Sequence, residues 1–326
     1  MAPVKILSID GGGIRGIIPA MVLAEIEERT GRPIARLFDL IAGTSTGGIL
    51  ALGLVKPGPA GRPEHSARKL AALYEKEGQR IFRATLWRRL ATAGSLAEEK
   101  YSAEGLESVL REYFGEARLR DALTEVIITS YETERRMPFF FKSRHAKTRE
   151  GYDFPMRLVA RATSAAPTYF EPLKLEAASG DDYFSLIDGG VYANNPAMCG
   201  YVEARVTHPE ADDFLLVSLG TGETTRRLRY EDVKSWGLAS WAQPILQVVF
   251  DGVSSTVDYQ LRQLLGPRNG ERRYFRFQTR LDPGCDDMDD ASADNVRTLR
   301  LLGEKLVRDQ QDDLDELCPL LLKAAG

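Results

Sequence analysis

The chain has 326 residues, a formal net charge of −4 at pH 7 and 43% hydrophobic residues. These values are ordinary for a soluble globular protein and give no basis for nucleic-acid binding as the main activity. No apolar run reaches the ~18 residues that a membrane span needs, and strand-like sequence begins so close to Met1 that no signal peptide is expected. Three widely spaced cysteines suit a reducing compartment. We therefore expect a cytoplasmic protein without a disulfide framework, bound metal or cofactor.

The first predicted element is a strand over residues 4–9, followed by the glycine-rich residues 10–16 and a helix from about Pro19 to Gly31. The loop fits G-x-G-x-x-G, so a Rossmann-like nucleotide-binding module is one interpretation. That motif expects an acidic residue at the end of the second strand, whereas the acid here, Asp39, precedes that strand.

An oxyanion hole is the other interpretation of the same loop. Consecutive glycines at a helix N-terminus present unhindered backbone N–H groups that can hold a developing negative charge. Arg15 would add charge or anchor the loop, and a plain surface arginine is equally consistent with the sequence. Asp10 suits a structural bond to the loop better than a catalytic base.

The second predicted strand, residues 37–42, leads into Gly43-Thr44-Ser45-Thr46-Gly47, and a helix over residues 48–54 follows. A strand, G-x-S-x-G and a helix together are typical of a nucleophile elbow, a tight turn that exposes the serine hydroxyl. The sequence therefore predicts Ser45 as a nucleophile for carbonyl chemistry, against the alternative of a structural turn of small residues.

A nucleophilic serine needs a base, and the chain has only three histidines, His65, His145 and His208. Each lies in a charged loop or just after a helix, where a solvated surface histidine is expected. His208 alone has the chain order of a hydrolase triad. We therefore look for the base among the carboxylates.

Asp188 ends a short apolar strand, residues 185–187, and two glycines follow it. The glycines let the backbone turn and allow a close neighbour, although Asp-Gly is also a common turn. Asp251 is a weaker candidate, in a segment that fits helix and strand equally well. Because a free aspartate has a pKa near 3.9, a base requires burial to raise that pKa. We expect Asp188 to be partly buried, within hydrogen-bond reach of Ser45.

The remaining expectations concern segments around this framework. Residues 81–90 could form a lid or membrane-contact patch, although a packed amphipathic segment is simpler. The acidic residues 286–290 lack an EF-hand pattern and suggest a solvated acidic turn or helix cap. Arg226-Arg227-Leu228-Arg229, and Arg268 with Arg272-Arg273, could bind phosphates or anionic headgroups, although solvated surface is commoner. Further helices are predicted over 64–82, 157–166, 236–265 and 293–322, and strands over 124–131, 138–142, 214–219 and 274–279.

Three motifs occur in a fixed order: residues 10–16, residues 43–47 and Asp188-Gly189-Gly190. With their flanks, and with residues 162–167 and 194–196, they resemble the patatin-like phospholipase family over roughly residues 4–222. The resemblance implies an α/β protein, a three-layer α/β/α fold with a mostly parallel central sheet. It also implies a Ser45–Asp188 dyad, with Asp188 as proton acceptor and an oxyanion hole formed by Gly11, Gly12 and Gly13 with Arg15 close by.

The function implied by the resemblance is hydrolysis of acyl esters in membrane phospholipids, of phospholipase A or lysophospholipase type, through an acyl-enzyme. Such a protein acts peripherally at the membrane surface. We expect one domain over residues 1–326, with the motifs in about 4–222 and a helical extension over about 236–326. The chain is also similar to bacterial patatin-like effectors of antiviral defence, which predicts activation by a cyclic di- or oligonucleotide. The Rossmann-like module remains the alternative, and titration with NAD would separate the two.

Overall fold

The central element is a single eight-stranded sheet in a computed structural model that describes residues 3–82, 101–149, 151–177, 182–241 and 244–323. The strand order is β5-β6-β3-β2-β1-β7-β8, with β4 paired to β3 beside this path. The strands are β1 Val4–Ile9, β2 Leu40–Gly43, β3 Glu125–Glu132, β4 Met137–Lys142, β5 Leu173–Glu176, β6 Tyr183–Asp188, β7 Phe214–Leu219 and β8 Tyr274–Phe277. The run from β3 through β2, β1 and β7 to β8 is parallel, whereas β4, β5 and β6 pair antiparallel, so the expected mostly parallel sheet is confirmed.

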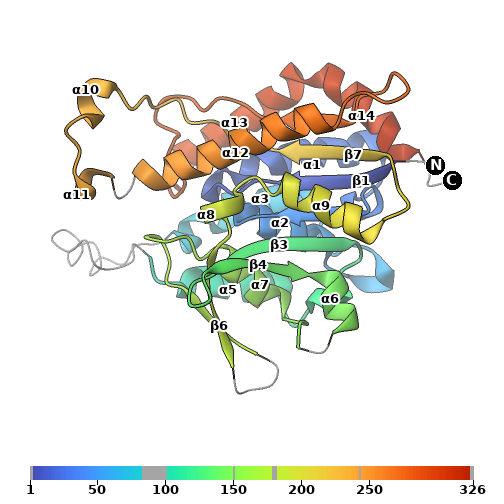
Figure 1. The fold of residues 1–326 in the computed structure, drawn as a ribbon, viewed down its shortest axis with the longest axis horizontal. Helices are drawn as coiled ribbons and strands as arrows, with labels where there is room; N and C mark the ends of the chain where they lie inside the picture. The colour runs from blue at the N-terminus through green and yellow to red at the C-terminus, as the bar shows by residue number, and fades with distance from the viewer. Residues whose placement is uncertain (1–2, 83–100, 150, 178–181, 242–243, 324–326) are drawn as a thin grey trace.

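Helices cover both faces of this sheet (Figure 1). Neighbouring residues of a strand point to opposite faces: Ile6 belongs to one buried apolar cluster and Leu7 to the other. The smaller cluster packs under α9 (Ala197–Thr207) and α12 (Pro244–Leu264), and the larger one under α1 (Ile17–Thr30), α2 (Thr46–Val55) and their neighbours. This is the expected three-layer α/β/α arrangement.

The other helices extend these two layers. They are α3 Ala67–Ile81, α5 Glu104–Phe114, α6 Ser143–Thr148, α7 Met156–Thr163, α8 Gly190–Ala193, α10 Tyr230–Val233, α11 Leu238–Trp241, α13 Ala293–Asp309 and α14 Gln311–Leu322. The C-terminal third joins the body closely, because β8 pairs with β7 and α13 packs along α1. Among the described helices, none has the length and apolarity to cross a bilayer.

Two long helices expected from the sequence are each divided in the structure. The expected helix over 293–322 breaks at Gln310, whose φ of −111° and ψ of 32° are non-helical. The apolar spacing runs on through the break, from Leu306 to Leu314 and Leu317, so nothing in the sequence marks the end of α13. Residues 236–265 likewise form α11 and α12 rather than one helix. Most of the segment expected as a lid, residues 83–90, lies outside the described residues.

Candidate active site

Ser45 occupies a sharp turn between β2 and α2. Its φ of 54° is positive, which costs a non-glycine residue conformational energy and marks the strained backbone of an elbow. Gly47 makes the turn possible, because a Cβ at this position would lie 2.1 Å from the carbonyl oxygen of Ile9. The second glycine of the motif is therefore required by a close backbone approach.

Hydrogen-bonded threonines hold this elbow in place. Thr163, at the end of α7, accepts a bond from the Ser45 N–H (2.8 Å) and donates to the carbonyl of Thr129 (2.6 Å). Thr44 donates to the carbonyl of Ala193 (2.6 Å) and shares a bond with the Thr129 hydroxyl (2.7 Å). Residues 162–167 contribute to the family resemblance, but sequence reasoning gave Thr163 no role.

The strand register brings Asp188 to Ser45. Gly43 of β2 lies opposite Ile128 of β3, and Asp188 of β6 lies opposite Ser130, two residues further along β3. Ser45 is two residues beyond Gly43, so the serine and the aspartate reach the same level of the sheet. Ser45 and Asp188 line the same cavity, and the Ser45 side chain is close enough to influence the pKa of the Asp188 carboxylate.

Asp188 is a buried carboxylate with few partners. Its side chain accepts the N–H of Gly190 at 2.8 Å, and the residue is only 2% exposed. Burial raises the pKa of Asp188 to about 7, although the Ser45 side chain and the bond from Gly190 act in the opposite direction. A carboxylate with this pKa can accept a proton near neutral pH.

The glycine loop lies on the other side of Ser45. The Gly11 N–H is already bonded to the carbonyl of Asn194 (3.0 Å), and the Ile14 N–H to that of Met288 (2.9 Å). Gly12 and Gly13 line the same cavity as Ser45. Neither of their N–H groups has a hydrogen-bond acceptor within the described part of the chain. Of the three glycines expected in an oxyanion hole, two therefore present free donors.

Arg15 and Asp10 lie behind this loop. Arg15 is only 5% exposed, its Nε donates to the carbonyl of Gly12 (3.3 Å), and its side chain lines a polar cavity of about 410 Å³ that does not include Ser45. Arg15 is thus an anchor of the loop and not a surface arginine. Asp10 forms a buried ion pair with Arg276 of β8 at 2.6 Å, a structural bond as expected, although its partner is remote in sequence.

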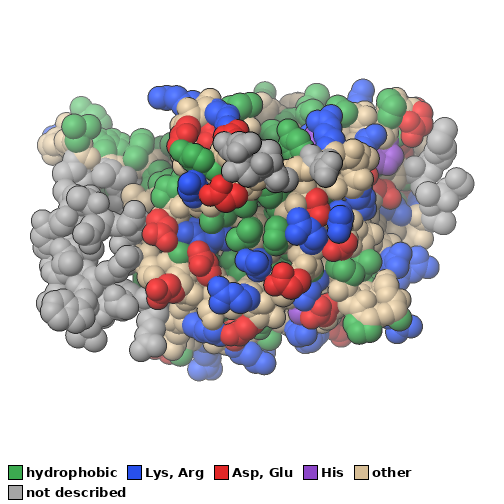
Figure 2. All heavy atoms as spheres, turned by 90° about the horizontal axis from the view of Figure 1, so that it is seen from below, with side chains coloured by type: hydrophobic (Ala, Val, Ile, Leu, Met, Phe, Trp, Pro, Cys, Tyr) green, Lys and Arg blue, Asp and Glu red, His purple; other side chains and the backbone are tan. Residues whose placement is uncertain are grey.

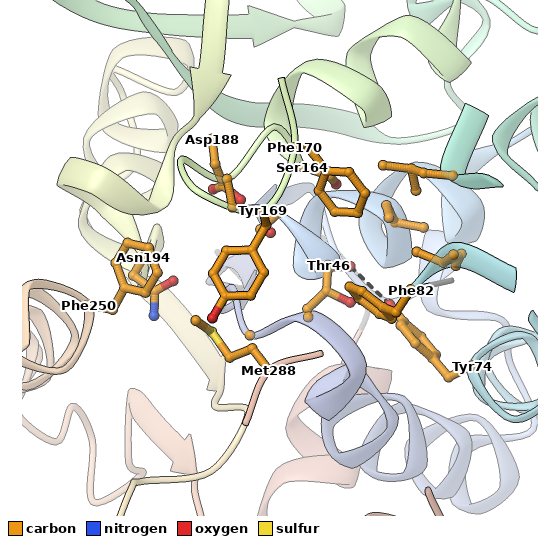
Figure 3. A pocket seen from close by; sticks show the side chains of 17 residues that line it. Thr46, Tyr74, Phe82, Ser164, Tyr169, Phe170, Asp188, Asn194, Phe250 and Met288 are labelled. Carbon is orange, nitrogen blue, oxygen red and sulfur yellow. Dashed lines mark hydrogen bonds between the residues drawn. The ribbon is translucent and has the colours of Figure 1, made fainter. Parts of the chain in front are cut away.

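The cavity beside Ser45 is small, about 60 Å³, and its wall is mainly apolar. Figure 3 shows Tyr169, Phe170 and Phe82 around the space between Asp188 and Tyr74. The sequence did not identify this wall, because its residues are scattered through the chain and none belongs to a motif. Its large apolar and aromatic members are Ile49, Tyr74, Ile81, Phe82, Leu106, Tyr169, Phe170, Phe250 and Met288.

The competing bases lie elsewhere. None of the three histidines lines the cavity that Ser45 lines. His65 was expected at the surface but is 3% exposed, because its ring packs against Tyr113 of α5 and contacts that residue's carbonyl at 3.1 Å. His145 and His208 are half-buried. Asp251 is exposed on α12, where it accepts a bond from the Thr224 hydroxyl.

Two charged segments differ from their sequence-based interpretations. Arg268, Arg272 and Arg273 are each paired with an aspartate at 2.7 Å, so they are not free to bind phosphate. The acidic residues 286–290 are not a fully solvated turn, because Met288 and Asp289 are buried and Asp289 accepts a bond from a tyrosine hydroxyl. No cluster of metal ligands occurs among the described residues.

The structure does not favour the Rossmann-like alternative. The position after β2 where that fold places an acid is held by Ser45. Asp39, at the other end of β2, accepts the backbone N–H of Lys5 at 2.8 Å. The cavity next to Gly12 and Gly13 is mainly apolar rather than lined with donors for a pyrophosphate.

Known proteins resemble this chain along most of its length. A family model described as "Patatin-like phospholipase" matches residues 7–199. Patatin-like protein 4 of Arabidopsis thaliana is 33% identical over 93% of this chain and 83% of its own length. A potato (Solanum tuberosum) protein described as "Probable inactive patatin-3-Kuras 1" is 34% identical over 94% of this chain and 86% of its own. A crystal structure of VipD from Legionella pneumophila aligns over 94% of this chain and 67% of that one, with 13% identity and a TM-score of 0.36. The chain belongs to the patatin-like phospholipase family.

Proposed function

We propose that this protein is a lipid acyl hydrolase, of phospholipase A or lysophospholipase type, in which Ser45 is the nucleophile and Asp188 the base. Family membership supports the class of reaction. It does not by itself establish activity, since one close relative is described as probably inactive. The observation that carries the proposal is that an elbow serine and a buried carboxylate, whose pKa is raised to about 7, line the same cavity.

The proposed reaction has two stages. The Ser45 oxygen attacks the ester carbonyl carbon while its proton passes to Asp188, and the resulting oxyanion accepts bonds from the Gly12 and Gly13 N–H groups. The tetrahedral intermediate collapses, Asp188 returns the proton to the leaving alcohol, and an acyl-Ser45 ester remains. Water then attacks this ester while Asp188 accepts a proton from the water. Asp188 returns that proton to the Ser45 oxygen as the acyl bond breaks, which releases the fatty acid and restores the serine.

The surroundings of Ser45 support a lipid as the substrate. The cavity wall is mainly apolar, so it favours the methylene groups next to the ester over a polar acyl donor. The N-terminus of α2 begins at Thr46, directly after the nucleophile, and adds a favourable field for the oxyanion. We propose membrane phospholipids as substrates, with the enzyme bound peripherally.

Activation by a cyclic nucleotide, with a role in antiviral defence, stays a prediction. Three of the arginines considered for phosphate binding are held in ion pairs, which leaves Arg226, Arg227 and Arg229 for that role. If hydrolysis is the same with and without a panel of cyclic dinucleotides, this part of the proposal is excluded.

Release of fatty acid from defined phospholipids tests the proposal. The wild-type protein should release fatty acid, and Ser45→Ala should abolish the release while keeping the circular dichroism spectrum of the parent. Ser66→Ala, which changes an exposed serine at the N-terminus of α3, is the matched control and should stay active. Equal release by Ser45→Ala and the parent would reject Ser45 as nucleophile.

A further inference from the structure

The segment between β7 and the body of α12 carries an unusual group of exposed apolar side chains. We call residues 226–241 and 244–248 the apolar arm; it contains α10, α11 and the first turn of α12. Leu238 is 95% exposed and Tyr230 74%, while Ile245 and Val248 are each 42% exposed. Exposed large apolar side chains concentrated in one segment are typical of an interaction site.

The charges of the apolar arm are mainly positive. Arg226, Arg227, Arg229 and Lys234 lie within nine residues, against Glu231 and Asp232, in a chain whose net charge is −4. Lys234 is paired with Glu231, but the three arginines have no ion pair among the described residues. This distinguishes them from Arg268, Arg272 and Arg273, whose charges are neutralised by aspartates.

The apolar arm adjoins the candidate active site. Arg226, Arg227 and Val248 line a groove of about 370 Å³ together with Asp251 and Asp287. These two aspartates directly follow or precede Phe250 and Met288, which line the cavity of Ser45. Figure 1 shows α10 and α11 projecting from one end of the molecule. In Figure 2 hydrophobic side chains gather at that end, whereas acidic and basic side chains alternate over the rest of the visible face.

We propose that the apolar arm docks the protein on the surface of an anionic phospholipid bilayer, with its apolar side chains in the interface and its arginines at the headgroups. Apolar residues and unpaired cations side by side fit such a surface, because burial and charge attraction both contribute to interfacial binding. A protein partner would supply carboxylates for only some of these arginines, whereas a bilayer presents negative charge along the whole arm. The inference rests on the proposed function, since docking at this place brings the lipid ester to Ser45.

Vesicle binding tests the docking separately from catalysis. The parent is Ser45→Ala, so that the lipid stays intact, mixed with vesicles of phosphatidylglycerol and phosphatidylcholine or of phosphatidylcholine alone. Sedimentation should show at least tenfold tighter binding to the anionic vesicles, decreasing with salt. Leu238→Asp should weaken it at least tenfold, and Arg226→Gln with Arg227→Gln and Arg229→Gln by about fivefold per arginine. Val206→Asp, at a 67% exposed valine on α9, is the control and should bind like the parent.

Hydrolysis assays then distinguish the two proposals. In the chain with an intact Ser45, Leu238→Asp should lower hydrolysis of phosphatidylglycerol vesicles at least fivefold and leave a water-soluble short-chain ester unaffected. A wild-type chain that binds anionic vesicles but cleaves no ester would refute the hydrolase and leave the docking surface standing. Arm variants that bind vesicles as the parent does would overturn the docking surface. The docking surface would also be overturned if the protein were a dimer that Leu238→Asp dissociates without changing vesicle binding. The apolar arm would then join two copies of this chain.

Discussion

The elbow at Ser45 and the glycine loop at Gly12 meet at one cavity but are supported from different parts of the chain. Thr163 and Thr129 hold the elbow, and both belong to the part matched by the family model. The glycine loop is held within that range by Asn194 and Arg15, but also by three residues beyond residue 199, where the match ends. The Thr221 hydroxyl donates to the carbonyl of Gly11, Arg276 pairs with Asp10, and the carbonyl of Met288 accepts the Ile14 N–H. The nucleophile is therefore positioned within the matched part of the chain, whereas the loop that carries the oxyanion amides depends in addition on contacts from the C-terminal third.

The largest expected effect is on the elbow side of the cavity and comes from removing the proposed base, Asp188, without removing a structural support. Asp188→Asn keeps the shape of the side chain but removes the base, so kcat for a soluble ester should fall about 10²–10⁴-fold. The fold should persist, because a neutral amide is easier to bury than a carboxylate. Asp251→Asn is the matched control, since Asp251 is exposed on α12, and it should retain full activity. Undiminished turnover by Asp188→Asn would move the base to another residue.

The corresponding change on the loop side is Arg276→Ala. Arg276 and Asp10 form a buried pair, with side chains 6% and 2% exposed, and Arg276 also donates to Ser218 at 2.7 Å. Removing one partner strands a buried charge, so the free energy of unfolding should drop by about 3–5 kcal/mol. Because Asp10 immediately precedes the glycine loop, kcat should also fall while KM changes little. Chemical denaturation and steady-state kinetics measure the two effects.

Arg300 provides the comparison for that experiment. It lies on α13, 52% exposed, with Glu304 at 3.1 Å and Glu75 at 3.7 Å. Exposed pairs of this kind are worth about 0–1 kcal/mol, so Arg300→Ala should be nearly neutral. If Arg276→Ala were equally mild, the claim that the C-terminal third supports the loop would be wrong.

The raised pKa of Asp188 predicts opposite pH trends for stability and activity. The native state keeps the proton up to about pH 7, whereas the unfolded chain loses it near pH 3.9. Between these values the native state binds more protons, so this group's contribution to stability falls as pH rises, by up to about 4 kcal/mol. Activity should rise as the pH increases towards 7, because Asp188 must be ionised to act as the base. Subtracting the unfolding curves of Asp188→Asn from those of the wild type isolates the contribution, and a difference independent of pH would contradict it.

The sequence predicts the elbow because its requirements are local. The spacing of Gly43, Ser45 and Gly47 reflects a turn that side chains would obstruct. Asp188 ends a strand and precedes two glycines, so its position can likewise be recognised from the residues next to it. The support of the glycine loop is not predictable by such reasoning. A backbone carbonyl such as that of Met288 has no residue signature, and the pairing of Asp10 with Arg276 spans 266 positions. The burial of His65 and the break at Gln310 likewise depend on packing between elements.

The smallest expected effect tests the elbow's own support. Thr163→Val keeps the shape of the side chain but removes the acceptor for the Ser45 N–H and the donor to Thr129, at a cost of about 1–3 kcal/mol of unfolding free energy. As a positioning residue, Thr163 should affect kcat by about tenfold with KM unchanged. Thr163→Ser, which keeps the hydroxyl, should restore most of the rate. Thr256→Val is the control, since among the described residues the exposed Thr256 hydroxyl bonds only to the carbonyl of Gly252, four residues earlier. A wild-type kcat for Thr163→Val would mean that the elbow holds Ser45 without help from α7. The elbow would then depend on its own residues alone, whereas the glycine loop at Gly12 depends on distant ones.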